Sequence, residues 1–273
     1  MTIKHYDVAI IGAQISGLLT AALLVRRGFR VLLIDHDGII HKYGEDQYIL
    51  PVLPEIILTP HPQSLITTIH TELGIIQDLR IHLQKFDPPF QIILPKKRLN
   101  LPLEKNQIIS ALITEWPDIA QAIEKFFLKI EHIESEVSNY LNGTEAFFPD
   151  GFFQRRRVRN FSVGFENVSK HFLDTDILED FPQNHPILEL FIAPLFFFSN
   201  ISPRDASLAQ FARTLGSFFR GASHLSTKVG HLRDMLLKKF TESGGEVLYN
   251  TKIQSMTFSR RKAESLHLTD SQY

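Results

Sequence analysis

A glycine-containing turn near the N-terminus holds the residues best suited to chemistry in this chain. Gly12 and Gly17 have the spacing of the first and last glycines of a G-x-G-x-x-G motif, and Gln14 stands where the second glycine belongs. Asp35 follows 23 residues after Gly12. In this pattern the turn brings a helix N-terminus to a pyrophosphate, whose charge meets free backbone N–H groups. The acid accepts hydrogen bonds from the adenosine ribose, so the spacing predicts an adenine-dinucleotide site.

Such a turn needs a strand before it, a helix behind it and a second strand that ends at the acid. The Val- and Ile-rich run Tyr6–Ile11 predicts a strand buried on both faces, and Leu18–Val25 predicts the helix. Gly28 is placed to end the helix, and Val31–Ile34 predicts the second strand. These elements make the motif far more specific than its glycines alone.

Gln14 leaves the use of this turn open. The second glycine normally lets the backbone approach the pyrophosphate without a Cβ atom in the way. The glutamine side chain could swing aside and hydrogen-bond a phosphate, or it could block the site. The sequence favours neither interpretation.

Composition narrows the function classes. The chain has 273 residues, a formal net charge of −1 and no cysteine. Its length allows one large core or two interleaved domains, and its charge gives no global attraction for nucleic acid. The absence of cysteine excludes disulfides, iron–sulfur clusters and thiolate zinc sites, and it fits a cytoplasmic location. The scattered histidines suggest no metal site either.

The first long apolar stretch is interpreted as a buried β–α unit and not as a membrane anchor. Residues 8–25 carry no charge, but they include Gln14, Ser16 and Thr20 and lead directly into Arg26 and Arg27. We therefore expect no transmembrane segment, although peripheral membrane contact stays open.

The segment "GAQISGLLTAALLVRRGFRVLLID" (12–35) resembles the N-terminus of the phytoene desaturase-like flavoprotein oxidoreductases, in the amine oxidase superfamily, which typically read GAGISGL here. Residues 71–75, 91–102, 113–127 and 202–256 resemble later family segments more diffusely. The resemblance implies an α/β fold: a Rossmann-type FAD/NAD(P)-binding domain formed by residues 1–60 and 225–273, with a largely helical substrate domain inserted at 61–224. It also implies that a helix leads through Gly244 and Gly245 into a strand beside the adenine.

Within the inserted part, residues 91–102 predict a hairpin, and residues 103–142 predict helices divided at Pro117. Turn residues at 149–151 and the basic run 155–159 are expected at the surface. The apolar run "ILELFIAPLFFF" (187–198) has two interpretations. The resemblance makes it part of an apolar substrate channel, whereas its composition fits ordinary core packing equally well.

The resemblance implies FAD-dependent oxidation or isomerisation of an apolar, polyene-like small molecule, with NAD as the second cofactor candidate. Because an acid at Asp35 disfavours a 2′-phosphate, NADP is the least expected ligand. No acid, base or nucleophile is assigned, because the flavin would carry the redox chemistry. The cofactor-binding candidates are Gly12, Ala13, Gln14, Ile15, Ser16, Gly17, Asp35, His36 and Ile253.

Three departures from the family pattern support other functions. Gln14 is one, and the loop "DHDGIIHKYGED" (35–46), which replaces a Gly-Gly-Arg-like segment, is the second. The third is that the sequence stops at Tyr273, before the family's second FAD motif. The alternatives are a truncated or degenerate flavoprotein that only binds, half of a split enzyme completed by a partner chain, and an NAD(P)-binding protein that uses the first motif alone.

Overall fold

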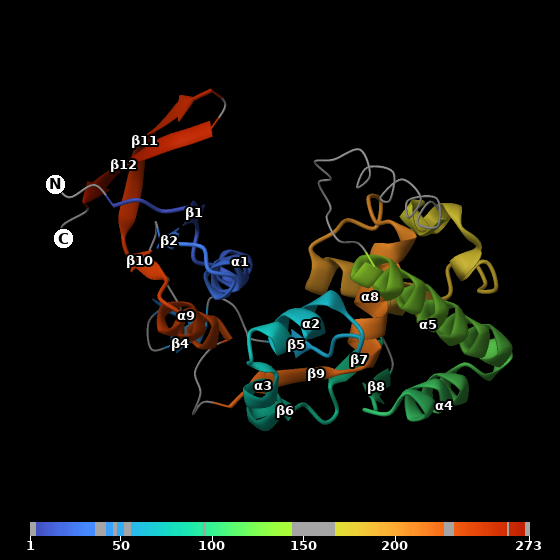
Figure 1. The fold of residues 1–273 in the computed structure, drawn as a ribbon. Coiled ribbons are helices and arrows are strands. Elements are labelled where there is room, and N and C mark those ends of the chain that lie inside the picture. The colour runs from blue at the N-terminus through green and yellow to red at the C-terminus, as the bar shows by residue number, and fades with distance from the viewer. Residues whose placement is uncertain are drawn as a thin grey trace. The chain divides into compact units, whose positions relative to one another are not determined.

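The computed structural model describes residues 4–35, 42–45, 48–51, 56–94, 97–143, 167–226, 232–260 and 262–270. The chain divides into two compact units, whose elements are labelled in Figure 1. The first unit consists of Met1–Glu55, Ile69–Leu83 and Leu225–Tyr273. The second consists of Ile56–Thr68 and Gln84–His224. Segments far apart in the sequence therefore build each unit.

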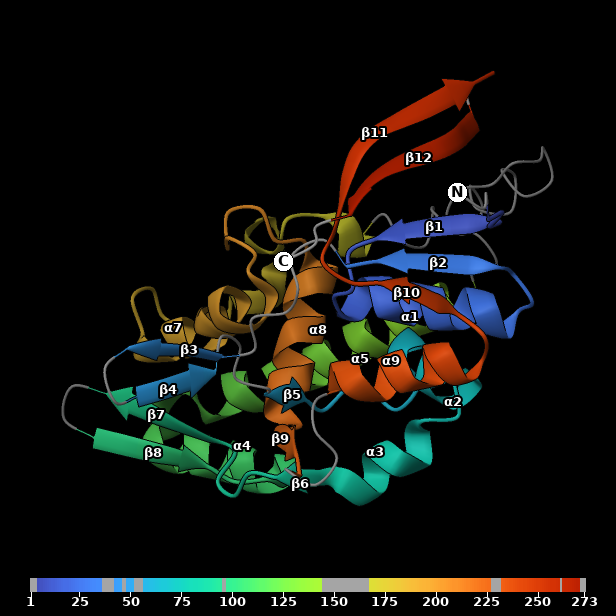
Figure 2. The same cartoon turned by 90° about the vertical axis from the view of Figure 1, so that its left-hand side faces the viewer.

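A three-stranded parallel sheet forms the centre of the first unit (Figure 2). Its order is β1 (Val8–Ile11), β2 (Val31–Ile34) and β10 (Glu246–Leu248), so β2 lies between a strand from each end of the chain. Helix α1 (Ile15–Arg26) packs on β1 and β2 and also against α9 (Leu232–Glu242). This is the Rossmann-type α/β arrangement that the sequence predicts.

The local sequence explains these elements. All four residues of β2 are buried, as expected for a parallel strand covered on both faces. The same expectation is wrong for β1, whose residues are half-buried or exposed, because β1 lies at the edge of the sheet that the described strands form. Helix α1 buries Leu18, Ala21, Ala22 and Val25, and the two alanines permit close packing. The helix begins at Ile15, inside the segment 12–17 that the motif assigned to the turn. It ends before Gly28, whose φ of +87° is the left-handed conformation that glycine adopts readily.

The chain returns to this sheet through the predicted helix–Gly-Gly–strand segment. Gly244, with φ +91°, follows α9, and β10 then pairs in parallel with β2, Val247 opposite Leu33. At Gly245 a Cβ atom would overlap the ring of Phe240. The turn therefore needs one glycine for its conformation and the other for its space.

The remaining elements of the first unit are small. An antiparallel hairpin, β11 (Thr251–Ser259) and β12 (Lys262–Asp270), follows β10. A second hairpin pairs β3 (Lys42–Glu45) with β4 (Tyr48–Pro51), and α3 spans Ile76–His82. Helix α2 (Leu65–Glu72) crosses the boundary between the units.

The second unit is mainly helical, with two small sheets. A sheet of order β5-β9-β6 and an antiparallel hairpin consist of β5 (Ile57–Leu58), β6 (Leu83–Lys85), β9 (Ala222–Leu225), β7 (Phe90–Leu94) and β8 (Lys97–Leu101). The helices are α4 (Lys105–Glu115), α5 (Ala120–Gly143), α7 (Pro186–Pro194) and α8 (Leu208–Phe219). Single turns are η1 (Pro117–Ile119), η2 (Phe172–Asp174), η3 (Asp176–Leu178) and the π-helical η4 (Leu195–Ser199).

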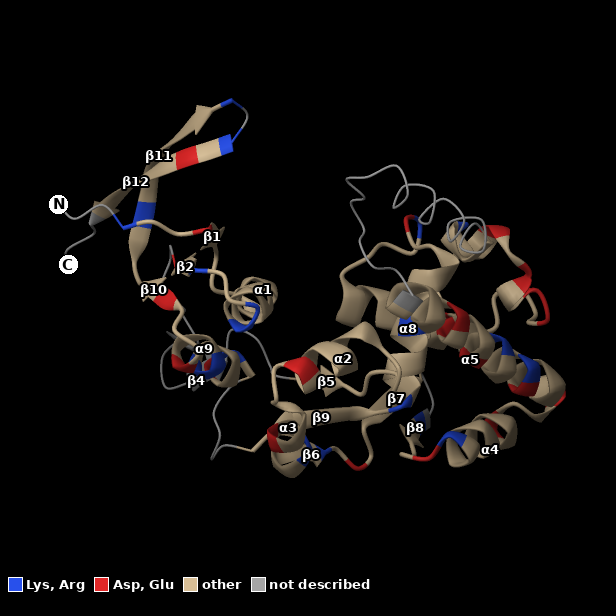
Figure 3. Ribbon diagram, in the orientation of Figure 1, with Lys and Arg blue, Asp and Glu red and all other residues tan. Residues whose placement is uncertain are grey.

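These elements confirm the predicted hairpin at 91–102 and the helices divided at Pro117. The expected surface turn at 149–151 and the basic run 155–159 lie outside the described residues. Charged residues of both signs lie along α5 (Figure 3), and its lysines pair with acids of another segment. Lys129, for example, lies 3.5 Å from a carboxylate oxygen of Asp176. Within the ranges given above, no helix has the length and apolarity needed to span a membrane.

Phenylalanine side chains dominate the core of the second unit. The rings of Phe126 and Phe191 stack with centroids 4.0 Å apart, and those of Phe172 and Phe211 stack at 4.4 Å. The first half of the apolar run 187–198 is therefore core, as the packing interpretation holds. Phe197, in contrast, is 80% exposed.

A buried ion pair links three parts of this unit. The Arg220 guanidinium donates two hydrogen bonds to the Glu134 carboxylate, 2.7 and 2.8 Å long, and its Nε–H donates to the carbonyl of Thr59. The Glu134 side chain is only 4% exposed. Gly216 leaves room for this carboxylate, because a Cβ atom there would overlap it. The pair connects α5, the end of α8 and the segment after β5.

His70 in α2 makes stability sensitive to mild acid. Its Nε2 is buried and has no hydrogen-bond partner among the residues that the structure describes, and burial lowers its pKa from the ordinary value of 6.5. As the pH falls through 6.5, the unfolded chain takes up a proton that the folded His70 does not, so stability decreases. We expect His70→Leu to raise the melting temperature at pH 5 relative to the parent chain, and to do so less at pH 8.

The same pH series on His132→Gln is the control, because the His132 side chain is 74% exposed. Its melting temperature should follow that of the parent chain. A parallel pH dependence in His70→Leu and the parent would contradict the assignment to His70.

Candidate nucleotide-binding site

The turn after β1 has the backbone geometry that the motif requires. The N–H of Gly12 donates to the carbonyl of Ile34 at 2.8 Å, which joins the ends of β1 and β2. Gly12 has φ +102°, and a Cβ atom there would meet no atom of the described residues within 4 Å. Glycine is therefore needed for the conformation, and the space beside it is open.

Gly17 allows α1 to start directly on this turn. A Cβ atom on Gly17 would overlap the carbonyl oxygen of Gly12 and would lie 3.5 Å from Cγ2 of Ile10. The helix could not approach β1 this closely with any larger residue. Gly17 thus has the packing role that the motif assigns to its last glycine.

The N-terminus of α1 is open to an anion. Gln14 is the N-cap residue, in an extended conformation, and its side chain makes no capping hydrogen bond. Gln14, Ile15 and Ser16 are exposed, whereas Ala13 is buried. The N–H groups of the first helical turn have no acceptor within the helix, so they can receive an anionic group. The geometry leaves both interpretations of Gln14 open.

Asp35 lies at the carboxyl end of β2, beside this turn. It is 5% exposed. Its N–H donates to the carbonyl of Leu248 at 2.8 Å, and its carbonyl accepts from the N–H of Thr251 at 3.2 Å. Its carboxylate is not free, because Oδ2 accepts a hydrogen bond from Nη2 of Arg233 at 3.2 Å.

Arg233 is the site residue that sequence reasoning missed. It belongs to the first turn of α9, and its Nε–H also donates to the carbonyl of Ala13 at 3.0 Å. One guanidinium therefore connects the glycine turn to the acid. No specific signal marks Arg233 in the sequence: a cation in the first turn of a helix opposes the helix dipole, but Asp234 stands beside it in the same turn.

The other predicted cofactor residues are less well placed. Ile253 lies in β11, opposite Leu268 and two residues beyond Thr251, and it is half-buried. His36 lies outside the described residues. Of the predicted set, the structure thus brings together the segment 12–17 and Asp35.

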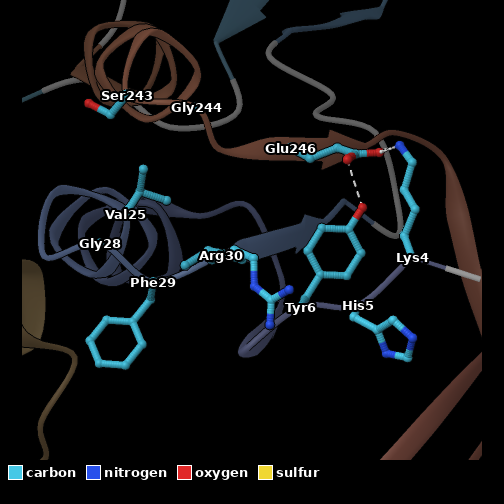
Figure 4. A pocket seen from close by; sticks show the side chains of 11 residues that line it. Lys4, His5, Tyr6, Val25, Gly28, Phe29, Arg30, Ser243, Gly244 and Glu246 are labelled. Atoms are coloured by element: carbon cyan, nitrogen blue, oxygen red, sulfur yellow. Dashed lines mark hydrogen bonds and ion pairs between the residues drawn. The ribbon is translucent and has the colours of Figure 1, made fainter.

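A hollow of about 470 Å³ lies at the opposite end of the same strands (Figure 4). Tyr6 and Lys4 both donate to Glu246 there, each over 2.7 Å. Burial and the neighbouring Glu246 carboxylate raise the pKa of Tyr6 to about 12. Ligands of parallel α/β sheets bind at the carboxyl ends of the strands, and this hollow is at the amino ends, so it is not the nucleotide site.

Comparisons with known proteins agree with this geometry. Residues 10–73 match the family described as NAD(P)-binding Rossmann-like domain. The chain is 22% identical over 270 residues to the inactive all-trans-retinol 13,14-reductase of Danio rerio, covering 94% of this chain and 43% of that protein.

Two solved structures show the same fold. An oxidoreductase from Methanosarcina mazei superposes with a TM-score of 0.54 at 14% identity, over 96% of this chain and 55% of that one. The Rab GDI of Plasmodium falciparum superposes with a TM-score of 0.51 at 10% identity, over 98% and 63%. The chain thus spans about half the length of the relatives it matches.

Proposed function

We propose that this chain binds an adenine dinucleotide, FAD in the first place, at the glycine turn. The backbone of residues 12–17 would hold the pyrophosphate, and Asp35 the ribose; His36 and Ile253 stay candidates from the resemblance alone. One observation carries the proposal: an open helix N-terminus and a buried acid lie side by side at the carboxyl end of the sheet. The proposed binding domain consists of residues 1–60 and 225–273.

The residues fit a pyrophosphate except at one position. The open space beside Gly12 and the close approach at Gly17 suit a phosphate that lies against the backbone. Gln14 is the exception, since it places a side chain at the motif's second glycine. When bound, a flavin would accept a hydride from the substrate, and the chain's part is to hold the dinucleotide at this edge.

The proposed activity is oxidation or isomerisation of an apolar, polyene-like small molecule. The resemblance to phytoene desaturase-like enzymes and the similarity to a protein named after all-trans-retinol support this class of substrate. That relative is described as inactive, so the similarity supports the substrate class more than turnover.

The second candidate is a non-catalytic binding module, or half of an enzyme that a partner chain completes. It is favoured by β1, which occupies one edge of the sheet formed by the described strands and carries Ile11 with 53% of its surface exposed. An apolar edge strand of this kind favours association. A Rab GDI and an oxidoreductase share the fold, so the fold alone does not choose between the candidates.

Titration of the purified chain with FAD and NAD⁺, followed by calorimetry, tests the proposal. Saturable FAD binding, or purification of a yellow protein, would support it. If FAD and NAD⁺ both fail to bind, the better interpretation is a non-catalytic binding module that holds no nucleotide. Light scattering on the same sample tests the second candidate. A chain that stays monomeric at all concentrations would contradict the idea that its sheet needs a partner chain to cover the edge strand β1.

Gln14→Gly should affect binding and stability in opposite directions. Removing the side chain clears the path of the pyrophosphate, so FAD or NAD⁺ should bind more tightly. Glycine also loosens the unfolded chain, which should lower the free energy of unfolding by up to about 1 kcal/mol. Calorimetry and thermal melting of the apo chain measure the two effects.

Gln14→Ala is the matched control, because it keeps the Cβ atom and removes the amide. Equal gains in affinity for alanine and glycine would assign the obstruction to the amide end. Weaker binding in both variants would mean that the glutamine holds a phosphate.

A further inference from the structure

Arg233 is placed where it can alter the choice of nucleotide. In the first unit, α9 packs against α1, and its first turn lies beside the carboxyl ends of β1 and β2. From there Arg233 contacts both the Ala13 carbonyl and the Asp35 carboxylate. These are the two places where a bound nucleotide would present its pyrophosphate and its ribose.

The geometry of the pair changes the charge at the ribose end. The Arg233 and Asp35 side chains are 11% and 8% exposed, and their N–O distance is 3.2 Å. A free acid at this position accepts ribose hydroxyls and repels a 2′-phosphate. An acid that is paired this closely with a guanidinium no longer presents a net negative charge to a ligand.

Arg233 also has donors left over. A guanidinium carries five N–H groups in a fixed plane. One on Nε and one on Nη2 serve Ala13 and Asp35. Within the described part of the chain, the other three have no acceptor. Guanidinium groups bind phosphate oxygens through such donors.

We propose that Arg233 determines nucleotide specificity at this site: by neutralising Asp35 and offering the N–H groups that no described residue accepts, it lets an adenosine with a 2′-phosphate bind as well as one without. The ligand class is therefore the NAD(P)-type adenine nucleotide with or without that phosphate. This revises the expectation, based on Asp35 alone, that NADP is the least favoured ligand. The inference rests on the proposed nucleotide site.

NAD⁺ and NADP⁺ are the probes, because they differ only in the 2′-phosphate. Calorimetry on the full 273-residue chain should give similar affinities for the two nucleotides. In Arg233→Met the acid is uncompensated, so NADP⁺ should lose at least about tenfold in affinity, while NAD⁺ changes much less. Arg233→Lys keeps the charge and should restore NADP⁺ binding, and Asp35→Asn should favour NADP⁺.

Arg30→Met is the control, because Arg30 pairs with Asp7 before β2, at the amino ends of the strands. Its NADP⁺/NAD⁺ affinity ratio should equal that of the parent. An equal loss for both nucleotides in Arg233→Met would mean a structural role only and would overturn the inference, as would a parent chain that rejects NADP⁺. If the parent binds FAD or NAD⁺ but the NADP⁺/NAD⁺ affinity ratio does not change in Arg233→Met, the proposed function stands and this inference falls. If no dinucleotide binds, both fall.

Discussion

Arg220→Met is expected to lower the free energy of unfolding by about 3 kcal/mol at neutral pH, because it leaves the Glu134 carboxylate buried without its partner. The lost contacts are two short hydrogen bonds to Glu134, one to the Thr59 carbonyl and one to the Ser217 hydroxyl. Gly216 adds to the effect, since the space that it leaves is shaped for a carboxylate. Urea denaturation, with the midpoint compared at constant m value, measures the loss.

Two variants separate an unpaired charge from a simple loss of contacts. The double substitution Glu134→Leu with Arg220→Met removes both charges and should recover most of the stability. Lys105→Met breaks an exposed pair with Glu131 of similar length, 2.7 Å, and should cost less than about 1 kcal/mol. If Arg220→Met costs no more than Lys105→Met, the buried pair does not stabilise the fold as argued.

The sequence predicts the nucleotide-binding half of the fold well because its signals are local. Apolar runs before Gly12 and before Asp35 indicate strands, of which only the second is fully buried, and glycines at 28 and 244 mark the ends of helices. Each of these features depends on residues within about one helix length of each other. The predicted order of strand, helix and strand therefore holds, but the bounds differ: β1 begins at Val8 and not at Tyr6, and α1 spans Ile15–Arg26 and not Leu18–Val25.

Arg233 shows why the site itself is harder to predict. It lies 198 residues from Asp35 in the sequence, and the two meet only because α9 packs on α1 while β10 pairs with β2. No periodicity within α9 distinguishes Arg233 from a surface arginine. The helix dipole gives no specific hint either, because Asp234 stands beside Arg233 in the same turn.

The phenylalanine run 196–198 shows a second limit. Helix α7 ends at Pro194, and the chain continues as a π-helical turn, Leu195–Ser199. A π turn inserts an extra residue and shifts which side chains face the core. Leu195 is fully buried, whereas Phe196 and Phe197 face solvent. The regular periodicity of an α-helix, applied to the sequence, does not predict that shift.

Gly17→Ala should damage binding and folding together. The new Cβ atom would overlap the Gly12 carbonyl oxygen, which is backbone and cannot rotate away. Helix α1 must therefore move off the turn, away from Ile10, at a cost of about 2 kcal/mol in unfolding free energy. The same movement displaces the open N–H groups, so FAD or NAD⁺ affinity should fall at least about tenfold. Thermal melting and calorimetry measure the two losses.

Gly28→Ala is the matched control at the other end of the same helix. Gly28 has φ +87°, and no described residue lies within 4 Å of an added Cβ atom. The cost is therefore conformational, about 1–2 kcal/mol, and the turn at Gly12 is not moved. Its stability loss should therefore resemble that of Gly17→Ala, while its nucleotide affinity should match the parent. Only Gly17→Ala disturbs the contact between α1 and the turn at Gly12. If the two alanine variants bind the nucleotide with equal affinity, this contact does not contribute to nucleotide binding.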